Sequence, residues 1–330
     1  MGGNESIMTG DLSRYDLSPS TYRLLQKDHI RFEEKYVRKF GNSFICRILI
    51  NYMRYAEKNF PDSFEKEIAD YFVSKAGNEY HIDFRLSFNK ALTEKMEQFD
   101  FVRLDSFRKR KAINFILEKY AGLPLAERER IYFVDHFKAI REAIENNIMI
   151  VIRNSYGAEY EVRPYKLEID DNTLSYYLIG FSRTRGSDAE FTCHSNKVSR
   201  IRMCYIKNTE SALSFSERTN AGKMLEKYGA AYMPKSLDSK EMDLSVIRLT
   251  ENGYNKLFLR SIAHQRPIPT DEPQAVEING KTFYELRFDC SYDQIKNYFF
   301  PFGADAVVVE PAELKAIFAE KYRDALKCYE

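Results

Sequence analysis

The sequence predicts an α+β protein built from three successive parts. In the first third, apolar residues recur at the three- and four-residue spacing of helices that bury one face. From about 148 to 206, short β-rich segments alternate with turns, which is typical of a small barrel. The last third alternates strand-like and helix-like segments. A chain of 330 residues is long enough for two or three domains, each with its own core.

Composition and charge limit the possible functions. The net charge is only +1, so any nucleic-acid site must be a local patch rather than the whole surface. The absence of a long apolar run and of a signal peptide predicts a cytoplasmic protein without a membrane segment. The cysteines include no Cys-x-x-Cys pair, so we expect reduced structural thiols. They are Cys46, Cys193, Cys204, Cys290 and Cys328.

Residues 11–58 predict a strand followed by two helices. Arg14–Ser18 alternates polar and apolar residues, and the serine and proline that follow Leu17 start a helix. Gly41 and Asn42 break that helix, and Ser43 is expected to cap the next one. The order strand, helix, capped helix resembles the ribbon–helix–helix module of small DNA-binding repressors.

A similar pattern returns over 80–121. Phe84–Ser87 matches Tyr15–Ser18, and Ser106–Phe115 matches Ser43–Tyr52. We expect tandem copies, unless both matches reflect helical periodicity alone. One ribbon–helix–helix unit cannot bury its apolar face by itself, so two copies in one chain can pair with each other.

The strands of the two copies form a possible ribbon face. Ribbon proteins read the major groove with outward-pointing strand residues. Carboxylates at such positions would repel phosphates, although opposite charges could neighbour each other across an antiparallel ribbon. We therefore favour a scaffold or protein-docking role for residues 1–122. The outward positions are Arg14, Asp16, Asp83 and Arg85.

Residues 123–210 are predicted to contain a linker, a leading helix and the barrel. Leu123–Leu125 and the charged run Glu127–Arg130 favour a linker. Ile131–Glu145 has the spacing of an amphipathic helix and leads into the strand Ile148–Ile152.

The strand Tyr176-Tyr177-Leu178, followed by the polar run His194–Val198, resembles the WYL domain, which is named for a Trp-Tyr-Leu strand in an Sm/SH3-like barrel. Here the tryptophan is a tyrosine, and the chain contains no tryptophan. The resemblance implies binding of nucleic acid or nucleotide-like ligands and a regulatory rather than enzymatic role.

In that family, two arginines on the next strand face a groove that takes an anionic ligand. Aligned on Val198, those positions are His194 and Lys197 here, and neither side chain has the guanidinium fork. Nearby arginines could restore the positive potential and tyrosines could stack bases, or these are simply exposed strand residues without a ligand. The candidate groove residues are Arg153, Tyr156, Arg163, Tyr177, His194, Lys197 and Arg200.

Residues 211–330 predict a further unit. The strands Val246–Leu249, Thr282–Phe288 and Ala306–Val309 alternate with helices, an order that resembles a ferredoxin-like split unit. Phe302–Asp305 and Val309–Pro311 resemble the C-terminal extension that accompanies many WYL domains. That resemblance implies a role in dimer formation and ligand contacts.

Catalytic motifs are missing from the sequence. It has no His-x-x-x-His spacing, Gly-rich phosphate loop or nucleophile elbow. We therefore expect no enzymatic activity, no cofactor and no metal.

The resemblance covers nearly the whole chain, and the chain is most similar to the WYL accessory proteins of type VI-D CRISPR systems. It implies a homodimeric accessory protein that binds single-stranded RNA and stimulates an RNA-guided, RNA-cleaving CRISPR effector nuclease. The alternative is a WYL-type transcriptional regulator with the ribbon on DNA and the barrel as ligand sensor. A pure protein-interaction scaffold would bind no nucleic acid.

Overall fold

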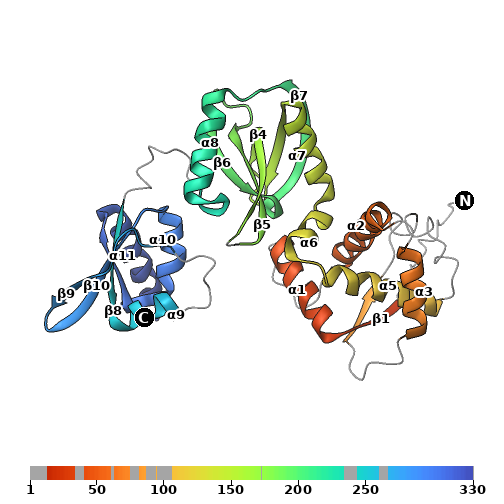
Figure 1. Cartoon of the computed structure of the whole chain (residues 1–330), viewed down its shortest axis with the longest axis horizontal. Coiled ribbons are helices and arrows are strands. Elements are labelled where there is room, and N and C mark those ends of the chain that lie inside the picture. The colour runs from red at the N-terminus through yellow and green to blue at the C-terminus, as the bar shows by residue number, and fades with distance from the viewer. Residues whose placement is uncertain are drawn as a thin grey trace, which may run out of the picture. The chain divides into compact units, whose positions relative to one another are not determined.

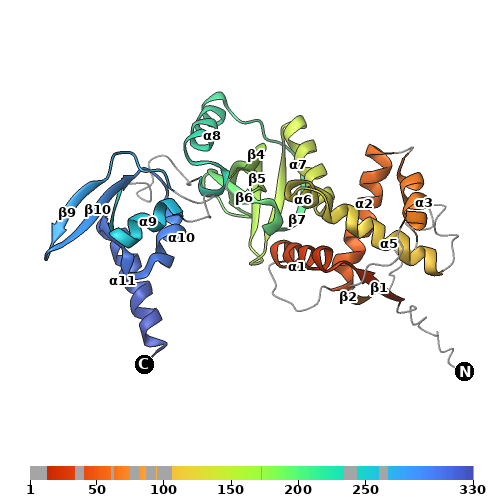
Figure 2. The same cartoon turned by 60° about the horizontal axis from the view of Figure 1, so that its bottom comes forward.

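A computed structural model of the chain divides into two compact units, residues 1–138 and 139–330. Figure 1 and Figure 2 show the elements of both units from two directions. Both units mix helices with antiparallel sheet, as an α+β fold requires. The structure describes residues 13–33, 41–60, 63–74, 82–86, 94, 106–171, 173–233, 244–259 and 267–329.

The first unit contains a ribbon of two antiparallel strands, β1 (Ser13–Leu17) and β2 (Ile82–Leu86). The strands of the two predicted copies therefore pair with each other within one chain, and the equivalent residues Tyr15 and Phe84 lie opposite each other. Residues of like charge lie directly opposite each other, and the opposite charges expected to be neighbours are diagonal to each other. The Cα partners are Tyr15 with Phe84, Arg14 with Arg85, and Asp16 with Asp83.

Helices pack around a common aromatic core in this unit. The first helix begins at Pro19 as predicted, and the Oγ of Ser18 accepts a hydrogen bond from the backbone N–H of Thr21 at 3.2 Å. The predicted Ser43 cap is wrong, because the second helix begins one residue earlier and has Gly41 at its N-cap. The helices are α1 (Pro19–Glu33), α2 (Asn42–Asn59), α3 (Phe64–Ser74), α5 (Ser106–Ala121) and α6 (Leu125–Tyr132).

The segment expected to be a linker is helix α6, which is packed into the first unit. Arg128 is buried, and its Nε donates to Asp28 Oδ2 on α1 at 2.6 Å. Burial raises the pKa of Asp28, and the hydrogen bonds and charge of Arg128 oppose that rise. One turn further along α6, the ring of Tyr132 lies 5.2 Å from that of Phe32 on α1. The charged run Glu127–Arg130 therefore belongs to a domain core rather than to a connection between domains.

The central sheet is antiparallel, with the strand order β6-β5-β4-β3-β7. Within the described residues of 148–210, its edge strands β6 and β7 do not pair with each other, so the expected closed barrel is corrected to an open sheet. Only the short turn Val198–Arg200 connects the two edges, so the sheet must curl as a barrel does. Its strands are β3 (Ile148–Asn154), β4 (Glu159–Asp170), β5 (Ser175–Thr184), β6 (Thr192–Lys197) and β7 (Ile201–Glu210).

Helices cover both faces of the central sheet (Figure 1). On one face, α7 (Val134–Asn146) contributes Ile140 and Ala143 to a core that includes Leu178 of β5. On the other, α8 (Phe215–Tyr228) packs over the residues of β5 that alternate with Leu178. Strand β5 is consequently buried on both sides.

The C-terminal sheet is antiparallel, with the order β11-β8-β10-β9. The succession βαββαβ is that of a split β-α-β unit. The sequence did not predict β9, because most of its residues are exposed and show no buried alternation. Its elements are β8 (Ser245–Thr250), α9 (Glu251–Leu259), β9 (Gln274–Ile278), β10 (Lys281–Phe288), α10 (Tyr292–Phe299), β11 (Ala306–Glu310) and α11 (Ala312–Lys327).

In the part of the chain that the structure describes, no helix combines the length and apolar character needed to cross a bilayer. All five cysteines are free thiols. Burial raises the pKa of Cys193, Cys204 and Cys290 to about 12, so these thiols are protonated and unreactive at neutral pH.

Candidate functional site

One face of the central sheet carries a dense set of charged side chains, which we call the charged face. Strand alternation produces it, because residues two apart point to the same side. Arg153 lies opposite Glu159 in the β3–β4 ladder, and Glu161 lies opposite Arg183 in the β4–β5 ladder. The charged face comprises Arg153, Glu159, Glu161, Arg163, Arg183, Arg185, Lys207 and, from α8, Glu217.

Two carboxylates hold four of these cations in place. Glu161 accepts from Lys207 Nζ at 2.5 Å and from Arg183 Nε at 2.9 Å. These hydrogen bonds, with that of Lys207 the stronger, hold the pKa of Glu161 below its usual range. Glu159 bonds to Arg153 and Arg185, which lower its pKa in the same way. The charged face is therefore an ordered ion-pair network with more cations than carboxylates.

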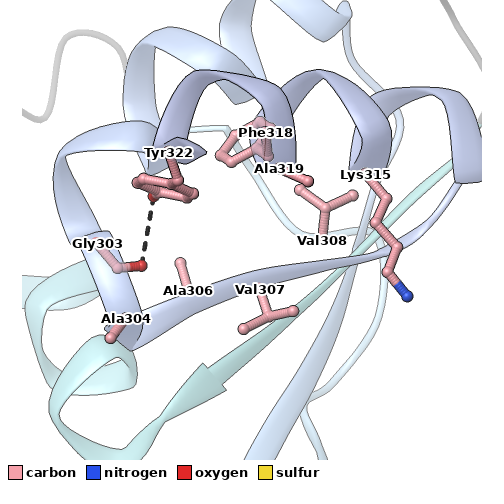
Figure 3. Close-up of a pocket in the computed structure, with 9 residues that line it drawn as sticks. All are labelled: Gly303, Ala304, Ala306, Val307, Val308, Lys315, Phe318, Ala319 and Tyr322. Atoms are coloured by element: carbon pink, nitrogen blue, oxygen red, sulfur yellow. Dashed lines mark hydrogen bonds between the residues drawn. The ribbon is translucent and has the colours of Figure 1, made fainter. Parts of the chain in front are cut away.

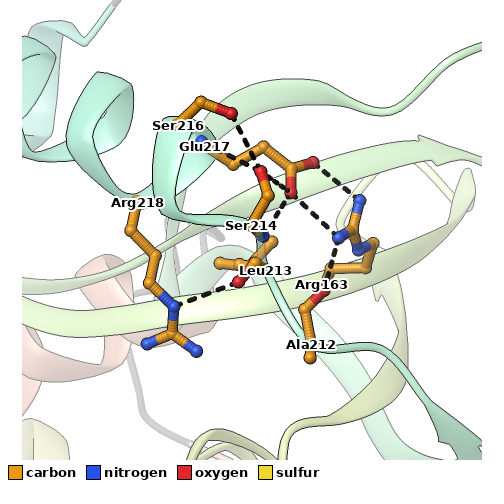
Figure 4. A network of polar contacts seen from close by, with 7 residues as sticks. All are labelled: Arg163, Ala212, Leu213, Ser214, Ser216, Glu217 and Arg218. Carbon is orange, nitrogen blue, oxygen red and sulfur yellow. Dashed lines mark hydrogen bonds and ion pairs between the residues drawn. The ribbon is translucent and has the colours of Figure 1, made fainter.

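Arg163 has a structural role at the covered end of this face (Figure 4). Its Nη1 donates to Glu217 Oε1 at 2.7 Å, and its Nη2 donates to the carbonyl oxygen of Ala212 at 2.8 Å. Glu217 is also the N3 residue of α8 and forms a capping box with the N-cap residue Ser214, whose Oγ accepts a hydrogen bond from the Glu217 N–H. With a side chain only 19% exposed, Arg163 fixes α8 to the sheet and has little surface left for a ligand.

The other end of the charged face is open to solvent. The side chains of Arg153, Arg185 and Lys207 are 43%, 51% and 44% exposed. Tyr205 of β7 is exposed on the same face, where its Cα partner is Val151. Tyr156 is largely exposed in the turn that follows β3. Cations that can hold phosphates therefore lie on the same face as one ring that can stack on bases, Tyr205, while Tyr156 is exposed in the turn that follows Arg153 and Asn154.

The seven predicted groove residues do not form one site. Tyr177 is buried in the core beneath α8 and presents no ring for stacking. Lys197 lies opposite Tyr177, whereas His194 lies opposite Gly180, so the two side chains are on different faces of the sheet. Arg200 is exposed in the turn between β6 and β7. Of the seven, only Arg153 lies on the open end of the charged face, and Tyr156 is exposed in the turn that follows its strand.

Sequence reasoning missed Arg183, Arg185, Tyr205 and Lys207. A signal for them was present, because Arg183 and Arg185 are two residues apart, as are Tyr205 and Lys207. In strands, that spacing places both members of each pair on one face.

The predicted ribbon face can be followed only at the level of the backbone. The positions of Arg14, Asp16, Asp83 and Arg85 lie in paired strands, but their side chains are outside the described part of the structure. Among the described residues, no group of three or more His, Cys, Asp or Glu side chains could hold a metal ion.

An apolar groove of about 500 Å³ lies between β11 and α11 (Figure 3). Phe318 and Tyr322 line it from the helix, and Val307 lines it from the strand. The Oη of Tyr322 donates to the carbonyl oxygen of Gly303 at 3.3 Å, which anchors the helix to the turn before β11. Since β11 is an edge strand, the groove opens beside unpaired backbone groups.

Comparison with known proteins shows the fold but no family. No family model matches the chain, and no curated protein matches it. A solved structure described as "Crystal structure of a CRISPR Cas-related protein" matches with a TM-score of 0.68 and 21% identity, over 100% of this chain and 96% of that one. Proteasome accessory factor B/C (PafBC) of Arthrobacter aurescens matches with a TM-score of 0.25 and 15% identity, over 100% of this chain and 52% of that one.

Proposed function

We propose that this chain is a non-enzymatic accessory protein that binds single-stranded RNA on the open end of its charged face. The observation that carries the proposal is the joint exposure of Arg153, Arg185 and Lys207 beside Tyr156 and Tyr205. Bases splayed from a single strand can stack on tyrosine, at about 1–3 kcal/mol each, while the cations hold phosphates.

The ion pairs of this face do not prevent binding. An exposed pair such as Arg185 with Glu159 is screened by solvent and contributes little to stability. A phosphate oxygen can therefore replace a carboxylate oxygen as the acceptor. The five cations outnumber the three carboxylates that pair with them, so the local charge is positive although the chain as a whole is nearly neutral.

The proposed biological partner is an RNA-guided, RNA-cleaving CRISPR effector nuclease, whose cleavage the chain stimulates in the cytoplasm. The WYL-like order of the central segment and the likeness in fold to a structure described as CRISPR Cas-related support this proposal. We further propose that the chain acts as a homodimer through residues 211–330. The apolar groove beside the edge strand β11 supports that part of the proposal.

Binding to single-stranded RNA, single-stranded DNA and duplex DNA, compared at about 50 and 200 mM salt, tests the proposed function. Strong, salt-sensitive binding to single-stranded RNA with weak duplex binding is expected. Addition of the chain to an RNA-guided, RNA-cleaving effector should then raise its cleavage rate. RNA binding that does not weaken as the salt concentration rises, or no RNA binding at all, would contradict the proposal and favour a protein scaffold.

A transcriptional regulator is the second candidate, with the ribbon on DNA and the central sheet as ligand sensor. The pairing of β1 with β2 within one chain favours it, since a two-stranded antiparallel ribbon fits the major groove. A clear preference for duplex DNA in the same comparison would select this alternative.

A further inference from the structure

The first unit contains an aromatic pocket, with a cavity of about 510 Å³. Rings from three helices and one connecting segment provide half of the lining residues, so the pocket results from helix packing rather than from one loop. The residues that line it are Tyr52, Phe60, Phe64, Glu67, Tyr71, Phe115, Glu118, Lys119, Gly122 and Leu123.

The rings stand around the cavity with their faces and edges close together. The centroid of Phe115 lies 6.4 Å from that of Phe64 and 5.1 Å from that of Tyr71. Tyr52 closes the wall from α2, at 6.3 Å from Phe64. The face of an aromatic ring is electron-rich, so a ring that lines the cavity can attract a cation.

The charge of the pocket also favours a cation. Glu67 comes from α3 and Glu118 from α5, and the Oη of Tyr71 donates to Glu118 Oε2 at 3.2 Å. Among the residues that line the pocket, Lys119 provides the one positive charge against these two carboxylates. A phosphate group would be repelled here, so the pocket does not suit a nucleic acid.

The chain itself already places a cation in the pocket. The Nζ of Lys119 lies 5.2 Å from the centroid of the Phe115 ring and 2.6 Å from Glu67 Oε2. The hydrogen bond from Lys119 is the main cause that lowers the pKa of Glu67. Because the Lys119 side chain is 47% exposed, this pair is weak and easily displaced.

We propose that the pocket binds an arginine side chain presented by a basic segment of a partner protein. The guanidinium would replace the Lys119 ammonium over Phe115 and bond to Glu67 and Glu118. Arginine fits better than lysine, because its planar group stacks on rings and bonds to two acceptors at once. The first unit would thereby dock a protein, independently of RNA binding by the charged face.

Calorimetric titration of the full chain with an acetylated, amidated Gly-Gly-Arg-Gly-Gly peptide tests the proposal. The same peptide with lysine or glutamate in place of arginine provides the comparison. Lys119→Met removes the competing ammonium and should tighten arginine-peptide binding about fivefold. Lys27→Met, an exposed position on α1 outside the pocket, removes the same charge and should leave the affinity unchanged.

The carboxylates provide the opposite test. Glu67→Gln with Glu118→Gln keeps the side-chain shapes and should weaken arginine-peptide binding about tenfold, with an unchanged circular dichroism spectrum. RNA binding should stay the same in every variant. Equal binding of the glutamate or lysine peptide, or equal effects of Lys119→Met and Lys27→Met, would overturn the proposal.

Discussion

Replacing Arg153, Arg185 and Lys207 together by glutamine removes the exposed cations of the charged face. The replacement should flatten the salt dependence of single-stranded RNA binding. The carboxylates that lose a cationic partner still have hydrogen-bond donors, because Glu159 is accessible to water and Glu161 keeps its hydrogen bond from Arg183. The fold should therefore survive the change.

The expected magnitude follows from counterion release. Each phosphate contact on a single strand contributes about 0.7 to the slope of log affinity against log salt concentration. Three contacts give a slope of about 2. Between about 50 and 200 mM salt, these contacts cost the unchanged chain about 20-fold in affinity, and the triple variant should lose that part of the dependence.

Fluorescence anisotropy with a labelled RNA strand measures the slope directly. The matched control is Lys281→Gln, Arg323→Gln and Lys327→Gln, which removes the same charge from exposed positions within residues 211–330, away from the charged face. The slope of the control should equal that of the unchanged chain. An unchanged slope in the charged-face variant, or an equal change in the control, would refute the assignment.

Three further predictions concern stability. In Gly253→Ala, the new Cβ would lie 2.2 Å from a backbone oxygen of the turn before β11, so the thermal midpoint should fall, at a cost of about 1–3 kcal/mol. In Gly222→Ala, which lies in α8, the nearest atom is 3.6 Å from the new Cβ, so the thermal midpoint should rise. Arg128→Met leaves Asp28 buried without its partner and should cost about 3–5 kcal/mol in urea unfolding, so an unchanged urea midpoint would show that the pair does not hold α6. The pKa of Glu161 is lowered in the folded state, so its ionised form stabilises the fold above about pH 4.5, and that contribution is lost as the pH falls through the folded pKa. Unfolding of Glu161→Gln should therefore depend less on pH between about pH 5 and 3 than unfolding of the unchanged chain. Equal pH dependence of the two would contradict the ion-pair network.

Local pattern predicted the strands β3, β5 and β6 of the central sheet, missed β4 and β7, and predicted the side-chain partners poorly. The strands follow from alternation and turn residues within a few positions. The opposite orientation of His194 and Lys197 also follows from alternation, since they are three residues apart, and sequence reasoning could have recognised it. The burial of Tyr177 could not be predicted in this way, because the residues of α8 that cover it come more than forty positions later in the chain.

Contacts between distant segments explain the other differences. Arg128 looked like part of a solvated run, but it is buried because α6 packs on Asp28 of α1, 100 residues earlier. Arg163 looked like a ligand contact, but the capping box of α8 provides its partner 54 residues later. In both cases a charged residue was given a surface role because its partner was not visible within the local pattern.

We propose that single-stranded RNA lies on the open end of the charged face. Photo-crosslinking of the full chain to an RNA strand that contains 4-thiouridine, followed by peptide mapping, tests that claim most directly. Crosslinks to the peptides that contain Tyr156 and Tyr205 are expected. Crosslinks confined to the ribbon or to residues 211–330, with both tyrosine peptides unmodified, would contradict this placement of the RNA.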